Sequence, residues 1–326
     1  AAIYQKIDSI SYVASGYAIP NEYDKLMSVI GANGTNAYTS TDMTVYVEDI
    51  PSNQIENWAR VEADRFMNPV LRGFHTELET VYEEKNMSLT RDFRKALETL
   101  DGMLFPDHPY GTQTVLGTQE HLKNPSVTNI KNYHKTYYVP NNMAICLSGD
   151  FDPDEMLSII EKYFGQMEPN KELPEVDFET KTVIESPVSK EVYGLDAENI
   201  MIGWKYPGAG TQEALVADVV SYILSNGSAG LIDLNLNQQQ KVLGAQSMSY
   251  TRPDAGEFLI MANPKHGQTL DEVKDLVLAE IAKLRAGEFD EALLTGTINN
   301  MKLNQMRMLE SNSDRADMFV QSFING

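Results

Sequence analysis

The sequence predicts an α+β fold of two related domains, each a mainly antiparallel sheet backed by helices. The chain has 326 residues, a length that suits two domains of ordinary size. In both halves, segments rich in β-favouring residues alternate with segments of helical periodicity. A stretch rich in proline and charge separates the halves. We therefore predict a first domain over residues 1–167, a linker over 168–188 and a second domain over 189–326.

The first half alternates helical and strand-like segments. Helical spacing of apolar residues covers most of 1–29, and the turn around Gly31 and Gly34 then leads into a predicted strand pair. The remaining predicted elements are helices over 51–68, 74–105, 127–138 and 152–165, a loop over 108–126, and a strand over 142–150. Asp152 is the expected N-cap of the last helix, and Gly165 lies just beyond its end.

The second half shows a similar alternation. Strands are predicted over 199–207, 245–253 and 256–264, and helices over 211–225, 230–240, 269–287 and 290–309. The repeated arrangement suggests that the halves are related by duplication, although the sequence contains no short tandem repeat.

Composition excludes several classes of partner. Apolar residues make up 42% and charged residues 22% of the chain, as in soluble globular proteins. Lys and Arg total 26 against 47 Asp and Glu, which gives a net charge of −21 and argues against nucleic acid and anionic membrane partners. No apolar run has the length of a membrane span. The only cysteine, Cys146, excludes an internal disulfide, and its apolar surroundings predict a buried strand position.

One helical segment concentrates negative charge. The stretch "FHTELETVYEEKN", residues 74–86, contains four glutamates. On a helix, Glu77 and Glu84 lie seven residues apart and share a stripe beside the apolar arc, within about 20° of each other. Glu79 and Glu83 point toward solvent. Lys85 falls inside the apolar arc, which only snorkelling of its long side chain explains.

Two like charges on a half-buried border need a cation or a hydrogen-bond donor. Arg91, one heptad further on, is one candidate and a bound metal is another, while a solvated helix face is the commoner use of such a run. No pair of histidines has the spacing of two ligands on one helix face, so each histidine is expected to be structural. The five histidines are His75, His108, His121, His134 and His266.

Four blocks of the sequence together resemble the pitrilysin/insulinase family of zinc metallopeptidases. They are "NEYDKLMSVIGANGTNAYTSTDMTVYVEDIP", "RVEADRFMNPVLRGFHTELETVYEEKN", "HPYGTQTVLGTQEHLKN" and "YYVPNNMAICLSGDFDPDEM". The resemblance covers almost all of the first domain, and their order and spacing make it more specific than one motif. The segment "SNGSAGLIDLNLNQQQKVLGAQSMSY" resembles the second domain of that family, which has the same fold.

The resemblance implies a metal site and a peptide site. In the family, an inverted His-x-x-Glu-His motif supplies two zinc ligands and the catalytic base, and a downstream helix supplies a glutamate ligand. By that match Glu84 is the zinc ligand, and Glu77 is a helper that orients a histidine ligand. The segment "GTNAYTS" matches the family's substrate-binding edge strand, so Asn36, Ala37 and Tyr38 are expected to pair with an extended peptide. An ordinary hairpin strand is the alternative for this segment.

The chain departs from the family pattern before residue 21, where "AAIYQKIDSISYVASGYAIP" contains no histidine. We therefore expect a fragment of a zinc endopeptidase of peptides or small unfolded proteins, with an N-terminally incomplete first domain. Such a fragment would be inactive alone and would not hold zinc tightly. Its partners would be the peptide substrate and the rest of the parent chain or a homologous subunit. The alternatives are a non-catalytic partner subunit and a module that only binds peptides; a periplasmic location fits the family's frequent export.

Overall fold

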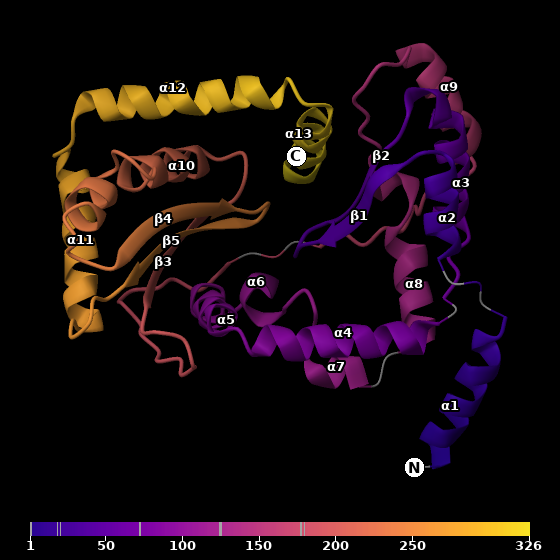
Figure 1. The fold of residues 1–326 in the computed structure, drawn as a ribbon, viewed down its shortest axis with the longest axis horizontal. Coiled ribbons are helices and arrows are strands. Elements are labelled where there is room, and N and C mark those ends of the chain that lie inside the picture. The colour runs from indigo at the N-terminus through magenta and orange to yellow at the C-terminus, as the bar shows by residue number, and fades with distance from the viewer. Residues whose placement is uncertain are drawn as a thin grey trace. The chain divides into compact units, whose positions relative to one another are not determined.

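The structure is a computed structural model that describes residues 2–17, 19, 21–71, 73–123, 126–176, 178 and 180–326. The chain forms two compact units (Figure 1). The first unit contains residues 1–88 and 115–176, and the second unit contains residues 89–114 and 177–326. Residues 89–114 therefore pack with the second unit, although they precede the predicted linker. The predicted domain boundaries at 167 and 189 remain a prediction.

The first unit combines helices with one two-stranded sheet. Its elements are α1 Ala2–Ser15, α2 Glu22–Val29, β1 Asn33–Thr39, β2 Thr44–Asp49, the short 3₁₀ turn η1 Ser52–Gln54, α3 Ile55–Met67, α4 Phe74–Leu89, α7 Gln119–Lys123, α8 Val127–Tyr137, the 3₁₀ turn η2 Pro140–Asn142 and α9 Pro153–Phe164. Asp152 accepts backbone hydrogen bonds at the start of α9, and Gly165 ends the helix, which confirms both predicted caps.

The core of the first unit lies between α2, α3 and α9. Met27, Trp58 and Ala59 are buried there. The Trp58 ring lies 6.1 Å from the ring of Phe164. This packing fixes the helices that support the β1–β2 hairpin, because buried apolar area is the main favourable term in folding.

The second unit is built on an antiparallel sheet of order β3-β5-β4. Its elements are α5 Asp92–Leu104, α6 Pro109–Thr112, β3 Ile200–Pro207, α10 Gln212–Leu224, the π-helical turn η3 Asp233–Asn237, β4 Gly244–Thr251, β5 Ala255–Asn263, α11 Leu270–Ala286, α12 Glu291–Met308 and α13 Asn312–Asn325. The predicted strands and most predicted helices are confirmed, and the predicted helix over 230–240 contains the π-helical turn.

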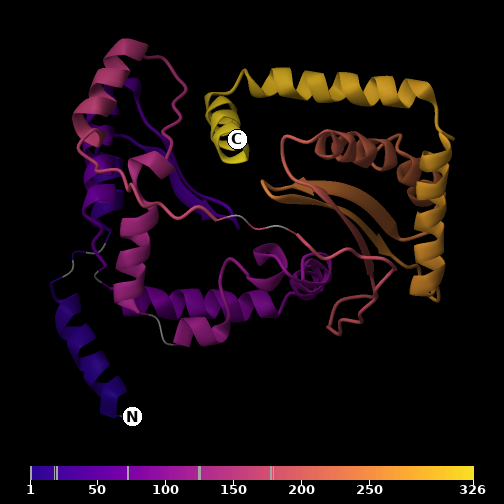
Figure 2. The same cartoon turned by 180° about the vertical axis from the view of Figure 1, so that it is seen from behind.

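Helices cover both faces of this sheet (Figures 1 and 2). Side chains of a strand point alternately to opposite faces. On β5, Phe258 and Ile260 join the core formed with α10 and α11, whereas Leu259 joins the core formed with α5. Gly203 on β3 allows α5 to approach closely, since a Cβ there would lie 3.1 Å from side-chain atoms of Leu100 and Leu104.

One predicted strand is wrong. Residues 143–148 form no regular element and pair with no strand among the described residues, and β1 and β2 pair only with each other. A strand needs a hydrogen-bonded partner, which local composition does not supply. Cys146 in this segment is half-buried rather than buried as predicted, and this burial raises the pKa of its thiol. Among the described residues, no helix combines the length and the apolar character needed to cross a bilayer.

Candidate functional site

The two candidate site carboxylates lie on α4. The single helix predicted over 74–105 is wrong in its extent, because α4 ends at Leu89 and α5 begins at Asp92. Glu77 lies in the first turn of α4, where its backbone N–H donates to the Gly73 carbonyl at 3.0 Å. Glu84 follows seven positions later, which places the two Cα atoms about 10.5 Å apart along the helix axis. They share one stripe, and Glu79 and Glu83 are exposed as predicted.

The expected half-burial of Glu77 and Glu84 is wrong, because both residues are exposed. Helical geometry fixes the direction of a side chain around the axis, but burial depends on what packs beside it. Lys85 is buried at 5% exposure, as its position in the apolar arc indicated. The His75 side chain lies outside the described residues.

The described residues do not form a zinc site by themselves. They contain no group of three or more His, Cys, Asp or Glu side chains that could hold a metal ion. A catalytic zinc takes three protein ligands and keeps one position for water. Glu84 offers one oxygen donor of the right type on an exposed helix face, so this chain could supply one member of such a set.

Two of the histidines have structural roles. His108 is 1% exposed, and its Nδ1 accepts the Tyr110 backbone N–H at the start of α6. Its Nε2 lies 3.2 Å from Asp254 Oδ2. His134 stacks on the Tyr138 ring at 4.6 Å, and burial lowers the pKa of its imidazole.

The candidate peptide-binding residues lie on β1, which pairs with β2 on one side and with no strand on the other among the described residues. Asn36, Ala37 and Tyr38 are consecutive and exposed. They lie opposite Val47, Tyr46 and Val45 in the antiparallel register.

The register determines which backbone groups face the open edge. The Ser40 N–H donates to the Met43 carbonyl at 2.9 Å at the hairpin turn. Because bonded and non-bonded pairs alternate in an antiparallel ladder, Tyr38 bonds to β2, whereas the Ala37 N–H and C=O point outward. The Ala37 N–H donates to the Asn36 side-chain oxygen at 2.8 Å, which agrees with this orientation.

The sequence reasoning missed two clusters of buried charged side chains. In the first unit, Glu48 and Glu62 lie beside Tyr23 and Arg65. Burial, with the neighbouring Glu48 carboxylate, raises the pKa of Glu62. Side chains two residues apart on a strand share a face, so Glu48 lies on the same face of β2 as Tyr46. This alternation was the sequence signal that could have predicted the position of Glu48.

In the second unit, Asp101 on α5 faces Glu257 on β5, and Arg252 lies 3.5 Å from Glu257. Arg252 is 5% exposed and its guanidinium lies 4.0 Å from the centre of the Tyr110 ring. Burial, reinforced by the Asp101 carboxyl, raises the pKa of Glu257 to about 8. The Asp101–Glu257 interaction links α5 to β5 of the sheet.

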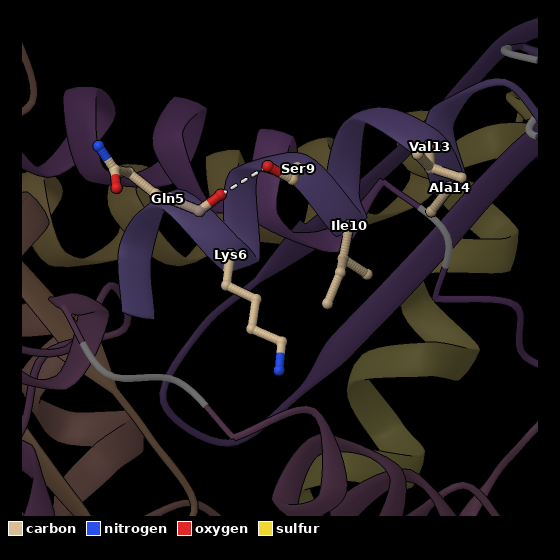
Figure 3. Close-up of a pocket in the computed structure, with 6 residues that line it drawn as sticks. All are labelled: Gln5, Lys6, Ser9, Ile10, Val13 and Ala14. Carbon is tan, nitrogen blue, oxygen red and sulfur yellow. Dashed lines mark hydrogen bonds between the residues drawn. The ribbon is translucent and has the colours of Figure 1, made fainter. Parts of the chain in front are cut away.

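A surface hollow beside α1 belongs to neither candidate site. A shallow space of about 570 Å³ follows one side of α1 (Figure 3). Its lining residues are Gln5, Lys6, Ser9, Ile10, Val13 and Ala14. The lining has one charged side chain and no acid–base pair or set of metal ligands, so it suggests no chemistry.

Comparison with known proteins identifies the family. Residues 126–301 match the family model described as "Peptidase M16 inactive domain", which is more than half of the chain. The chain therefore belongs to the M16, or pitrilysin/insulinase, family of peptidases, and the resemblance seen in the sequence is confirmed.

Relatives of the chain are zinc proteases and processing-peptidase subunits. The zinc protease PqqE of Helicobacter pylori is 23% identical over 348 residues, which cover 100% of this chain and 76% of PqqE. A probable mitochondrial-processing peptidase subunit beta of Schizosaccharomyces pombe is 24% identical over 265 residues, which cover 76% of this chain and 57% of that subunit.

Solved structures support the fold. The crystal structure of a protease from Helicobacter pylori superposes with a TM-score of 0.82 at 23% identity, covering 93% of this chain and 75% of that protein. This likeness confirms the α+β fold class.

Proposed function

We propose that this chain is part of a zinc-dependent endopeptidase that hydrolyses peptides or small unfolded proteins. The observation that carries the proposal is the placement of Glu77 and Glu84 on one exposed stripe of α4 in a member of a family of zinc proteases. An exposed carboxylate is available to a metal that other segments help to hold.

In this proposal, Glu84 is one zinc ligand and Glu77 orients a histidine ligand through its second ring nitrogen. The two histidine ligands and the glutamate base belong to a segment outside these 326 residues. A zinc ion held in that way lowers the pKa of a bound water and polarises the scissile carbonyl. Because the described residues do not complete the site, we expect this chain alone to bind zinc weakly and to be inactive.

The substrate is an extended peptide that adds as a strand to the outer edge of β1. Asn36, Ala37 and Tyr38 provide the contact, and the outward N–H and C=O of Ala37 are its backbone partners. Main-chain pairing gives affinity that depends little on peptide sequence. That property suits a peptidase of varied or unfolded substrates.

A non-catalytic partner subunit is the second candidate. Two observations favour it: the matched family model is described as an inactive domain, and one relative is a subunit of a processing peptidase. Such a subunit would use the same β1 edge to present peptides to an active homologue, without a zinc ion of its own.

Hydrolysis of a quenched fluorogenic peptide by the full-length parent protein tests the proposal. We expect turnover that a zinc chelator abolishes and added zinc restores, and no turnover by the 326-residue chain alone. A full-length protein that binds the peptide but neither contains zinc nor cleaves the peptide would support the partner-subunit candidate instead. Turnover by the isolated chain would contradict the proposed placement of the base.

A further inference from the structure

A buried polar cluster lies beneath the β1–β2 hairpin, and Glu48 of β2 is its centre. The Glu48 side chain is 7% exposed. Its Oε2 accepts the Trp58 indole N–H at 2.6 Å, and its Oε1 accepts the Tyr23 hydroxyl at 2.7 Å. A single carboxylate of β2 is therefore bonded to both α2 and α3.

The partners of Glu48 are themselves fixed. The Tyr23 hydroxyl also lies 2.8 Å from Glu62 Oε1, and Glu62 is 2% exposed. The Arg65 guanidinium bonds to Glu62 and lies 3.7 Å from Glu48 Oε1. It also lies 4.5 Å from the ring centres of Tyr23 and Tyr46. Contacts on several sides restrict the orientation of every group in the cluster.

Stability alone is a poor reason for this arrangement. Removing two carboxylates from water costs free energy, and apolar side chains of similar volume often replace buried ion networks without loss of stability. What hydrogen-bonded charges provide that apolar contacts lack is direction, because donors and acceptors must meet at defined distances and angles.

The cluster lies next to the residues proposed to bind peptide. Asn33 pairs with Asp49 and Asn36 with Val47, so two residues of β1, Gly34 and Thr35, lie opposite Glu48 alone. This is a β-bulge, and Gly34 adopts the positive φ of +64° that one type of bulge requires. A bulge bends its strand and re-aims the residues that follow it.

Tyr46, two residues before Glu48 on the same face of β2, also contacts α3. Tyr46 lies directly opposite Ala37, and its ring stands edge-on to Phe66 of α3 at 5.2 Å. Glu48 and Tyr46 thus attach the hairpin to α3 beneath the bulge and beneath Ala37.

We propose that Glu48 is a positioning residue that holds the edge of β1 in the orientation that a peptide strand requires. The inference rests on the proposed function. Without the Glu48 contacts the hairpin would fluctuate, and peptide binding would include the cost of ordering it. The ground state and the transition state share that cost, so KM rises while kcat is unchanged.

The test compares Glu48→Met with Glu48→Gln in the full-length enzyme, using a quenched fluorogenic peptide. Methionine fills a similar volume but makes no hydrogen bonds, so we expect KM to rise about three- to tenfold with kcat within about twofold. Glutamine can accept from Trp58 and donate to the Tyr23 oxygen, while Tyr23 donates to Glu62. We therefore expect Glu48→Gln to restore KM to within about twofold of wild type.

Glu56→Gln is the matched control, because Glu56 also lies in the first unit but forms an exposed ion pair with Lys162. It should leave KM and kcat unchanged. An unchanged KM in Glu48→Met, a loss confined to kcat, or an equal loss in Glu48→Gln would overturn the proposal. If Glu48→Met does not fold, Trp58→Phe removes one donor and should raise KM in the same direction by a smaller factor.

Amide hydrogen exchange separates this inference from the proposed function. The Asn36 and Tyr38 amides belong to the β1–β2 ladder, so they should exchange faster in Glu48→Met than in wild type, and Glu48→Gln should restore slow exchange. A wild-type protein without peptidase activity would contradict the proposed function, yet the exchange result would still decide whether Glu48 holds the strand. Equal exchange in all three proteins would contradict the positioning role.

Discussion

At Ala37, the strand register gives a role to the backbone, although the methyl side chain has no polar group. Its N–H and C=O face the open edge of β1, whereas the neighbouring Tyr38 pairs with Val45 in the ladder. A sequence window identifies "NAYT" as a strand, but the outward residue follows only from the hairpin turn at Ser40 and Met43.

Replacing Ala37 by proline tests the outward orientation. Proline removes the N–H that a peptide carbonyl would accept, and edge strands tolerate it where the N–H faces solvent. We expect Ala37→Pro to weaken binding of a labelled unstructured peptide about tenfold, measured by fluorescence polarisation, with the helical circular dichroism unchanged. Ala37→Val, which keeps the N–H, is the control, and equal binding by wild type and Ala37→Pro would exclude pairing at this residue.

The carboxylates of α4 show what sequence periodicity could and could not predict. The shared stripe of Glu77 and Glu84 follows from helical geometry and is present, but both residues are exposed rather than half-buried. Direction around a helix is local information, whereas burial depends on segments distant in sequence. The same limit hid Glu48, whose partners Tyr23 and Trp58 come from two different helices.

At the scale of elements, the central strand β5 is buried on both faces. One of its buried side chains, that of Glu257, carries a carboxyl group. Glu257 points to the same face as Leu259, toward α5, where it meets Asp101. Burying two carboxyls side by side is favourable only when they hold a proton between them. This proton should make the attachment of α5 depend on pH.

The pKa of Glu257 is raised from an ordinary 4.5 to about 8, so the folded chain binds a proton that the unfolded chain has released. Its contribution to stability is complete below about pH 4.5 and is lost as the pH rises through about 8. We expect a melting temperature about 5 °C lower at pH 9 than at pH 6, measured by differential scanning fluorimetry. Glu257→Gln should reduce this difference and the exposed Glu213→Gln should not; the same slope in all three proteins would refute the shared proton.

Sequence patterns predicted individual elements better than their pairing. Strands β3, β4 and β5 and the caps of α9 lie where composition and turn residues indicated. Residues 143–148 have the same apolar composition but no strand partner among the described residues. Strand formation depends on a neighbour, and one sequence window carries no information about that neighbour.

At the scale of the whole molecule, the second unit is discontinuous in sequence. Residues 89–114 supply α5 and α6, and Leu100, Leu104 and Phe105 pack with Leu259 of the sheet. Asp107 also accepts the backbone N–H groups of residues 181 and 182, and Asp92 accepts the backbone N–H of Asp196. Through these hydrogen bonds, the segment that precedes β3 contacts residues 74 to 104 positions earlier in the chain.

Two fragments test this division. We expect residues 89–326 to unfold cooperatively on heating, because both faces of the sheet stay covered. Residues 177–326 alone would expose the face that α5 covers, so their melting temperature should be at least about 10 °C lower, or the transition should lose cooperativity. Circular dichroism melting measures both, and identical transitions would support the contiguous division predicted at 167 and 189.

Zinc content of the full-length protein tests the central claim, that Glu84 belongs to the metal site of an M16 peptidase. The comparison is between wild type, Glu84→Gln and Glu83→Gln, since Glu83 is the adjacent exposed glutamate on the same helix. We expect about one zinc per chain in wild type and in Glu83→Gln, and at least about a tenfold loss of zinc affinity and peptidase activity in Glu84→Gln. Full zinc and activity in Glu84→Gln would contradict the account.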